Sequence, residues 1–236
     1  MRLDKFLSVT GTLSRSEAKR AIRAGRVSVG GIAAKSGELQ LDPENQIVRL
    51  DGREIVYRRF TYIMLNKPEG YVSATDDPRY KTVLELLPDE LQRLELFPCG
   101  RLDKYTLGLM LLTNDGELSH RLLAPKSHVS KNYRFHAAHP ISEADRVSLE
   151  TGVHIEGGYL TKPAKVALDE DAQSGIITIC EGKYHQIKQM LEAVSNKITY
   201  LERVSFGPLE LDTALARGEW RFLTDEEIAE LREAAK

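Results

Sequence analysis

Asp103 is the residue whose surroundings in the sequence are best suited to chemistry. It lies in a loop bounded by Gly100 and Gly108, with Arg101 and Lys104 close to it on either side. Nearby cations favour the ionised form of a carboxylate, so we expect this aspartate to be charged in a partly dry cleft. A charged carboxylate in a loop that leads into an apolar strand is a candidate catalytic group, although an ordinary loop salt bridge produces the same pattern.

Two segments far from Asp103 in the sequence offer partners for it. Residues 131–135 have the pattern of an extended segment and carry Tyr133, which is able to stack on a planar base or to fill the core. Residues 181–191 turn from a strand into a helix and carry Lys188, which either reaches a functional site or lies in solvent. These segments form a site with Asp103 only if the fold brings them together.

Several other chemistries lack the motif that they need. Residues 31–36 resemble a phosphate-binding loop but have no glycine before Lys35, and no G-x-G-x-x-G motif occurs. His136 and His139 are three residues apart on a segment with an extended pattern, without a third ligand close by. The G-x-S-x-G motif of many hydrolases is also missing. We therefore predict no cofactor and no metal site.

The elements that must position these residues belong to an α+β fold, because strands and helices mix without regular alternation. The pattern changes near residue 60, which predicts one domain at residues 1–58 and a second at residues 61–236. In the second domain we predict strands at 62–65, 109–113, 133–137, 176–180 and 204–211, and helices at 83–87, 117–123, 142–150 and 185–194. Thr224 and Glu227 form the capping box of a last helix.

The composition is that of an ordinary globular protein. The 236 residues suggest one or two domains, and 42% of them are hydrophobic and 29% charged. The longest apolar stretch, at residues 107–112, is far shorter than the ~20 residues that span a bilayer, and we expect no secretory signal from residues 1–5, where charged and apolar residues alternate. Cys99 and Cys180 are expected to be buried thiols. We expect a cytoplasmic protein that contacts no membrane.

The charge is distributed unevenly along the chain. Residues 1–37 contain eight basic and two acidic residues, a net charge of +6, so the remainder carries −8 of the total of −2. A basic N-terminal module on a mildly acidic body is typical of a nucleic-acid-binding domain attached to another domain.

The basic module has a clear pattern of helices. The spacing of Leu3, Phe6 and Leu7 predicts a helix that ends near residue 11, and Ser14 with Glu17 forms the capping box of a second helix. Within the second helix, three cations lie four residues apart on the side opposite the apolar stripe: Arg15, Lys19 and Arg23. We interpret this row as a phosphate-binding ridge, although a solvated helix face has the same spacing. Short strands are predicted at residues 27–29 and 47–50.

The module resembles the S4 RNA-binding domain over residues 1–58. The resemblance lies in R-L-D-K-F-L at residues 2–7, S-R-S-E-A at 14–18 and I-R-A-G-R-V-S-V-G-G at 22–31. Because S4 domains occur in several kinds of protein, this resemblance implies RNA as a partner without fixing the chemistry.

The three candidate segments of the second domain resemble the catalytic motifs of the RsuA-type pseudouridine synthases. The G-R-L-D-x-x-T-x-G-L motif is complete at residues 100–109, K-x-Y lies at 131–133, and G-x-x-H-Q-[IV]-K at 182–188. Residues 65–72, 161–164 and 201–204 also match, and residues 66–78 are most similar to members that act on small-subunit RNA. Many members have a second cation where this chain has Gln189. The resemblance implies a catalytic domain with a mixed, mainly antiparallel sheet flanked by helices.

The resemblance also implies roles for individual residues. Asp103 is expected to be the catalytic carboxylate, Tyr133 to pack on the flipped base, and Lys188 to pair with the aspartate, with no cofactor. The expected substrate is a uridine of 16S ribosomal RNA, free or in a small-subunit assembly intermediate, bound by a monomer. The residues expected to bind RNA are Arg2, Lys5, Arg15, Lys19, Arg23, Arg26, Lys67 and Arg101.

Three alternatives remain open from the sequence. A family member that modifies 23S ribosomal RNA would carry the same motifs. A non-catalytic protein that binds ribosomal RNA or assists ribosome assembly would use the same fold without needing Asp103. A hydrolase dependent on the aspartate would release free uracil.

Overall fold

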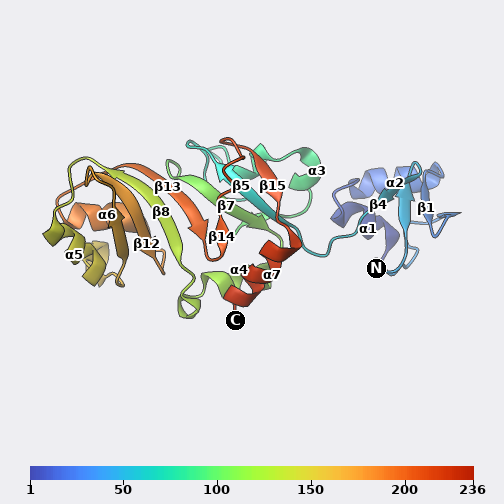
Figure 1. Ribbon diagram of the computed structural model, residues 1–236. Helices are drawn as coiled ribbons and strands as arrows, with labels where there is room; N and C mark the ends of the chain where they lie inside the picture. Colours follow the sequence, from blue (N-terminus) through green and yellow to red (C-terminus); the bar gives the residue numbers. More distant parts are fainter. The chain divides into compact units, whose positions relative to one another are not determined.

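The computed structural model describes residues 1–236, apart from the side chain of Pro125. The chain forms two compact units. The first comprises Met1–Thr61 together with Leu87–Phe97, and the second comprises Tyr62–Leu86 together with Pro98–Lys236. Figure 1 shows the elements of both units.

The first unit packs two short helices against a small sheet. The helices are α1 (Leu3–Val9) and α2 (Arg15–Arg23), and the sheet has the order β2-β1-β3-β4, with strands β1 (Val27–Val29), β2 (Ile32–Ala33), β3 (Val48–Leu50) and β4 (Arg53–Ile55). The capping box predicted for Ser14 and Glu17 is present, with each side chain bonded to the other residue's backbone N–H. The predicted apolar faces of both helices form the core, which leaves the cations of α2 in solvent. The short helix α3 (Asp89–Gln92) lies in the segment 87–97.

The second unit is built on a nine-stranded mixed sheet. Its main path has the order β11-β12-β8-β13-β7-β5-β15, and β14 and β6 pair with β13 and β7. The strands are β5 (Tyr62–Lys67), β6 (Phe97–Pro98), β7 (Leu107–Thr113), β8 (Lys131–Ala137), β11 (Lys165–Leu168), β12 (Ser174–Ile179), β13 (Ile198–Phe206), β14 (Leu209–Glu210) and β15 (Trp220–Phe222). β13 pairs with β7 in parallel, whereas the other pairs along the main path and the pair of β13 with β14 are antiparallel, so the sheet is mixed and mainly antiparallel.

Helices cover this sheet near its ends. They are η1 (Val83–Leu86), α4 (Gly116–Leu123), η2 (Pro125–Ser127), α5 (Glu143–Thr151), η3 (Glu156–Gly158), α6 (Gln186–Ala193) and α7 (Asp225–Ala234), with a small hairpin of β9 (His154–Ile155) and β10 (Tyr159–Leu160). Helix α5 packs on β11 and α6 on β13, whereas α4 packs on α7 (Figure 1). The fold class is α+β, as predicted. Within the part of the chain that the structure describes, no helix is both long and apolar enough to span a bilayer.

Three predictions about local structure need correction. The apolar run at residues 204–211 is two strands, because the chain turns at Gly207, where φ is +56°, and pairs back on itself. The element at residues 83–87 is a 3₁₀ turn at Val83–Leu86 rather than an α-helix. Cys99 is buried as expected, but Cys180 is only partly buried.

Candidate active site

The loop that carries Asp103 is fixed by hydrogen bonds on both sides of it. The Ser73 hydroxyl donates to the Leu102 carbonyl at 2.8 Å and accepts the Leu102 N–H at 3.0 Å. On the other side, the Thr106 N–H donates to the Asp103 carbonyl at 3.0 Å, just before β7 begins. The buried side chain of Leu102 anchors the loop to the core. The Asp103 carboxylate is therefore presented from a short, constrained turn.

Asp103 is contacted by two side chains at the start of α6. The Lys188 Nζ donates to Oδ2 of Asp103 at 2.8 Å, and the Nε2 of His185 lies 3.5 Å from Oδ1. The carboxylate is 27% exposed, so this ion pair lies at the mouth of a pocket and is partly desolvated. The structure thus brings together Asp103 and Lys188, which are far apart in the sequence.

The loop pattern suggests that Arg101 and Lys104 are the partners of the Asp103 carboxylate, but their side chains have other surroundings. The Lys104 ammonium lies over the Tyr80 ring, 3.7 Å from its centroid. Arg101 is exposed and lines the same pocket as Asp103. The partner that holds the carboxylate comes instead from the distant helix α6.

Tyr133 lies on β8 and lines the same pocket as Asp103. It is 7% exposed, and the Arg203 guanidinium interacts electrostatically with its phenol group. Burial raises the pKa of the phenol above its ordinary value of 10, and the negative charge of Asp103 acts in the same direction. Tyr133 therefore presents a neutral phenol ring to the pocket.

The pocket has a volume of about 590 Å³, within the usual range for sites that bind small ligands. Its walls come from the Asp103 loop, β8, β13 and the turn that leads into α6. Apolar side chains such as Leu122, Ile179 and Leu201 contribute to the wall beside the charged groups. A cavity of this kind can enclose one flat base and keep part of it from water.

Three buried cations lie beneath the pocket or next to it: Lys67, Lys131 and Arg203. The Lys67 ammonium donates to the carbonyls of Pro68, Lys104 and Thr106, and Lys131 donates to the Val129 carbonyl at 2.8 Å. Burial lowers the pKa of both lysines from 10.5 to about 8.

The burial of Lys67 corrects one prediction. Sequence analysis expects this lysine to bind RNA, but its exposed fraction is 0% and its ammonium is bonded to backbone carbonyls. A side chain without exposed surface cannot contact RNA in this conformation. Lys67 instead holds the backbone of the Asp103 loop, because two of its carbonyl partners belong to Lys104 and Thr106.

Arg203 reaches its buried position because β13 approaches β7 very closely. A Cβ atom at Gly108 would lie 2.3 Å from the Arg203 carbonyl oxygen, and φ of Gly108 is +96°, so only glycine fits there. The Arg203 Nε donates to the Leu109 carbonyl at 2.8 Å. Gly108 ends the Asp103 loop, and it thus also sets the position of the Arg203 guanidinium beside Tyr133.

The turn between β12 and α6 is ordered by Glu181. Its carboxylate accepts hydrogen bonds from the Tyr159 hydroxyl, the Lys162 N–H and the Gln186 side chain, at 2.8–2.9 Å. Gln189 adds a further link, because it accepts from the Glu156 N–H at 2.8 Å and donates to the Tyr184 carbonyl at 2.7 Å. The Gln189 amide therefore holds the loop in front of α6.

Comparisons with known proteins match this chain over nearly its whole length. The family model described as RNA pseudouridylate synthase matches residues 61–193, and the S4 domain model matches residues 1–47. An uncharacterized RNA pseudouridine synthase of Bacillus subtilis is 52% identical over 99% of each chain. The chain belongs to the RNA pseudouridylate synthase family.

Two further comparisons agree with this assignment. The ribosomal small subunit pseudouridine synthase A of Yersinia pestis is 46% identical to this synthase over 97% of each chain. A crystal structure described as a pseudouridylate synthase has a TM-score of 0.69 and 39% identity, covering 98% of this chain and 99% of the other. The S4 domain and the synthase fold predicted from the sequence are therefore confirmed.

Sequence reasoning missed several residues of the synthase pocket. His185 and Arg203 belong to segments that were recognised as motifs, but no role was given to either of them. Their position in those segments is the signal from which a role could have been predicted for His185 and Arg203. Tyr159 carries no such signal, because its contact with Glu181 depends on how the β9–β10 hairpin packs near α6. Within the described residues, no cluster of side chains has the composition of a metal site.

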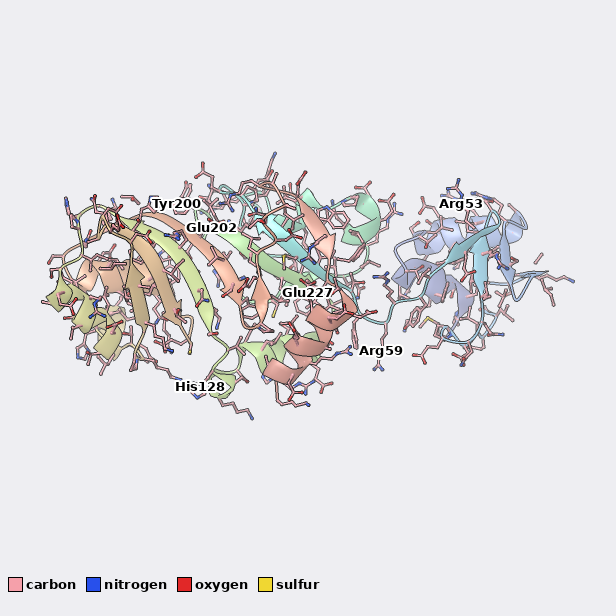
Figure 2. All side chains as sticks on the ribbon, viewed as in Figure 1. Arg53, Arg59, His128, Tyr200, Glu202 and Glu227 are labelled. Atoms are coloured by element: carbon pink, nitrogen blue, oxygen red, sulfur yellow. The ribbon has the colours of Figure 1, made fainter. Side chains whose placement is uncertain are left out.

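The predicted RNA-binding cations of the S4 domain differ in their surroundings. Lys5, Arg15, Lys19 and Arg23 are exposed, and the last three lie along α2. Arg2 pairs with Asp4 at 2.7 Å, and Arg26 pairs with Asp51 through two hydrogen bonds. The α2 row is therefore better placed to meet phosphates than the two paired arginines are. Figure 2 shows the side chains of this unit around the labelled Arg53.

Proposed function

We propose that this synthase converts a uridine of small-subunit ribosomal RNA to pseudouridine, with Asp103 as the catalytic carboxylate. The observation that carries the proposal is the ion pair of Asp103 and Lys188 at the mouth of a pocket that Tyr133 also lines. The name of the Yersinia pestis relative supports the choice of RNA. The specific target that we propose is uridine 516 of 16S ribosomal RNA.

The reaction exchanges one bond of the nucleoside for another. The bond from C1′ to N1 breaks, the uracil turns, and a bond from C1′ to C5 forms while the proton of C5 is lost and N1 gains one. Asp103 either attacks C1′, adds to C6 or assists elimination to a glycal, and on each of these routes Lys188 pairs with it through the hydrogen bond to Oδ2. Tyr133 packs on the detached base, and the pocket wall keeps water from it.

The target base must leave its stack before the carboxylate reaches the sugar. Extrusion costs a few kcal/mol, which contacts with the surrounding RNA have to offset. We propose that Arg101, exposed at the pocket, occupies the vacated space or holds a phosphate. The S4 domain, proposed as residues 1–58, binds neighbouring RNA through Lys5 and the α2 row, while residues 61–236 carry out catalysis as a monomer.

Mapping of pseudouridine tests this proposal. Transcripts of small- and large-subunit ribosomal RNA and partial ribosomal particles are treated with wild-type protein or Asp103→Asn, and pseudouridine is located by carbodiimide modification and reverse transcription. We expect one new stop in small-subunit RNA that depends on Asp103. A stop only in large-subunit RNA would refute the proposed substrate, and the absence of any stop would favour a binding protein without catalysis.

A further inference from the structure

An exposed cluster of two aromatic rings and a lysine lies next to Asp103. The Lys104 ammonium is 3.7 Å from the centroid of the Tyr80 ring and 5.4 Å from that of the Tyr105 ring. Tyr80 is 46% exposed and Tyr105 is 65% exposed, so both rings offer surface to a ligand. Soluble proteins usually bury much of a tyrosine ring, and two exposed rings around one cation call for an explanation.

The Tyr80 loop is held in place rather than free in solvent. The Asp77 carboxylate accepts the N–H groups of Arg79 and Tyr80, both at 2.9 Å. On the far side of Tyr80, the Val72 N–H donates to the Lys81 carbonyl at 2.9 Å. These bonds fix the loop on both sides of Tyr80, so its ring is presented to solvent at low entropic cost.

The Lys104 end of the cluster is fixed through its backbone. The Lys104 carbonyl accepts from the Gly70 N–H at 2.9 Å and from the buried Lys67 ammonium at 3.2 Å. Because the backbone makes these bonds, a different side chain at position 104 would leave the loop unchanged. Consistent with this, Lys104 and Tyr105 occupy the two positions that the G-R-L-D-x-x-T motif leaves open.

The charge around the cluster favours an anionic ligand. Arg79 and Lys81 flank Tyr80 and are exposed. Asp76 and Asp77 lie in the same loop, and Asp77, which accepts two backbone N–H groups, also interacts electrostatically with Arg79 and Lys104, so the three cations exceed the two carboxylates by one charge. Among the described residues, no ion pair joins a carboxylate to Lys104, Arg79 or Lys81. Exposed rings together with a cation are the elements that bind unpaired nucleotides, since each base offers a face for stacking and each phosphate a charge.

We propose that Tyr80, Lys104 and Tyr105 form a subsite for one unpaired nucleotide next to the target uridine, the rings stacking on its base and the ammonium binding its phosphate. The subsite deepens the proposed function and rests on it, because the nucleotide is defined by its distance from the uridine that reaches Asp103. The subsite affects which RNA the enzyme binds, and it takes no part in breaking the C1′–N1 bond or forming the C1′–C5 bond. We therefore expect its loss to alter KM more than kcat.

Steady-state kinetics on a short RNA that the wild-type enzyme modifies test the subsite. Each base stack is worth at least about a fivefold change in affinity, so Tyr80→Ala and Tyr105→Ala should each raise KM about fivefold or more, with kcat within about twofold. The matched variants Tyr80→Phe and Tyr105→Phe keep the ring and should leave KM within about twofold. Lys104→Met should lower the slope of log KM against log salt by about 0.7.

Substrates with an abasic residue at each neighbouring position locate the nucleotide. At one position the abasic substrate should abolish the difference between wild type and Tyr80→Ala, because no base is left to stack. The proposal is overturned if the alanine variants keep the wild-type KM, if the phenylalanine variants lose as much as the alanine variants, or if no abasic position removes the difference.

Failure of the proposed function is a separate outcome. In that case the wild-type enzyme itself forms no pseudouridine that depends on Asp103, whatever the state of Tyr80. Direct binding of a single-stranded oligonucleotide containing 2-aminopurine then decides the subsite. Equal affinity and equal fluorescence quenching for wild type and Tyr80→Ala would refute it, whereas weaker quenching by the variant would support it.

Discussion

Lysines and arginines are exposed on helix α2 of the S4 domain, whereas some of those beside the catalytic pocket are buried. In the S4 domain, Arg15, Lys19 and Arg23 are exposed along one helix. In the catalytic unit, Lys67 and Arg203 are almost completely buried and donate to backbone carbonyls. Exposed cations act over a distance and are screened by salt, whereas buried ones fix local geometry, and burial lowers the pKa of Lys67. The number of cations in a segment therefore does not reveal whether they meet a ligand or hold the fold.

The largest effect is expected when the half-buried cation at the pocket is removed. Lys188→Met leaves the Asp103 carboxylate without its closest partner, and the loss of such a pair costs about 4 kcal/mol, or roughly 10³-fold in rate. RNA affinity should be retained, because the S4 domain is unchanged. Single-turnover assays and filter binding measure the two quantities. Lys165→Met, on the exposed part of β11, is the control. Full turnover by Lys188→Met would refute the pairing.

A second change tests the close approach that buries Arg203. In Gly108→Ala the added Cβ meets the Arg203 carbonyl at 2.3 Å, and alanine is strained at the φ of +96°. The free energy of unfolding should fall by roughly 3 kcal/mol or more. Gly116→Ala is the matched control, since nothing lies within 4 Å of its Cβ and helix α4 gains up to about 1 kcal/mol. Urea unfolding measures both, and equal stability of the two variants would contradict the steric argument.

The buried lysines predict a pH dependence of the free energy of unfolding. Burial lowers the pKa of Lys67 from 10.5 to about 8, so between these values the unfolded chain holds a proton that the folded chain has released. Because the unfolded state binds more protons there, the free energy of unfolding rises with pH, by up to about 3 kcal/mol for Lys67. Urea unfolding at about pH 8 and about pH 10 measures this rise in the free energy of unfolding. The rise should be smaller in Lys67→Met than in wild type or Lys165→Met.

The smallest effect concerns the exposed cations. Replacing Arg15, Lys19 and Arg23 together by Gln should reduce the slope of log affinity against log salt by about 0.9 for each lost phosphate contact in a duplex. Arg26→Gln should change the slope less, since Arg26 is already paired with Asp51. Salt-dependent filter binding measures this slope. A triple variant with the wild-type slope would show that α2 does not meet the RNA.

Removal of residues 1–58 tests whether the S4 domain as a whole contributes to RNA binding. The remaining chain should stay folded, because the sheet of the second unit contains no strand from this segment. RNA affinity and its salt dependence should both fall. Circular dichroism and filter binding on the truncated chain measure these properties, and unchanged affinity would remove the role given to the S4 domain.

Sequence patterns predicted the elements of this protein better than the surroundings of its charged side chains. Capping boxes at Ser14 and Thr224 and the apolar runs of β5 and β7 are local signals, and each is present in the structure. The pairing of Asp103 with Lys188 was expected from the resemblance, not from the residues themselves.

The environment of a long side chain depends on contacts that no local pattern contains. Lys67 follows five buried residues of β5, yet its sequence gives no sign that three carbonyls surround its ammonium. Lys104 is next to Asp103 in the chain, but its ammonium turns to Tyr80 because the Tyr80 loop is bonded into place beside it. Both cases are decided by tertiary packing, which periodicity does not encode.

The double hydrogen bond between Ser73 and Leu102 has a mechanical consequence. One hydroxyl group accepts from and donates to the same residue, so the segment before the Tyr80 loop and the loop that carries Asp103 are joined by two bonds at one point. Separating them breaks both bonds together, and neither loop can slide past the other. A displacement of the segment before the Tyr80 loop would thereby be transmitted through the Ser73 hydroxyl to the residue directly before the carboxylate.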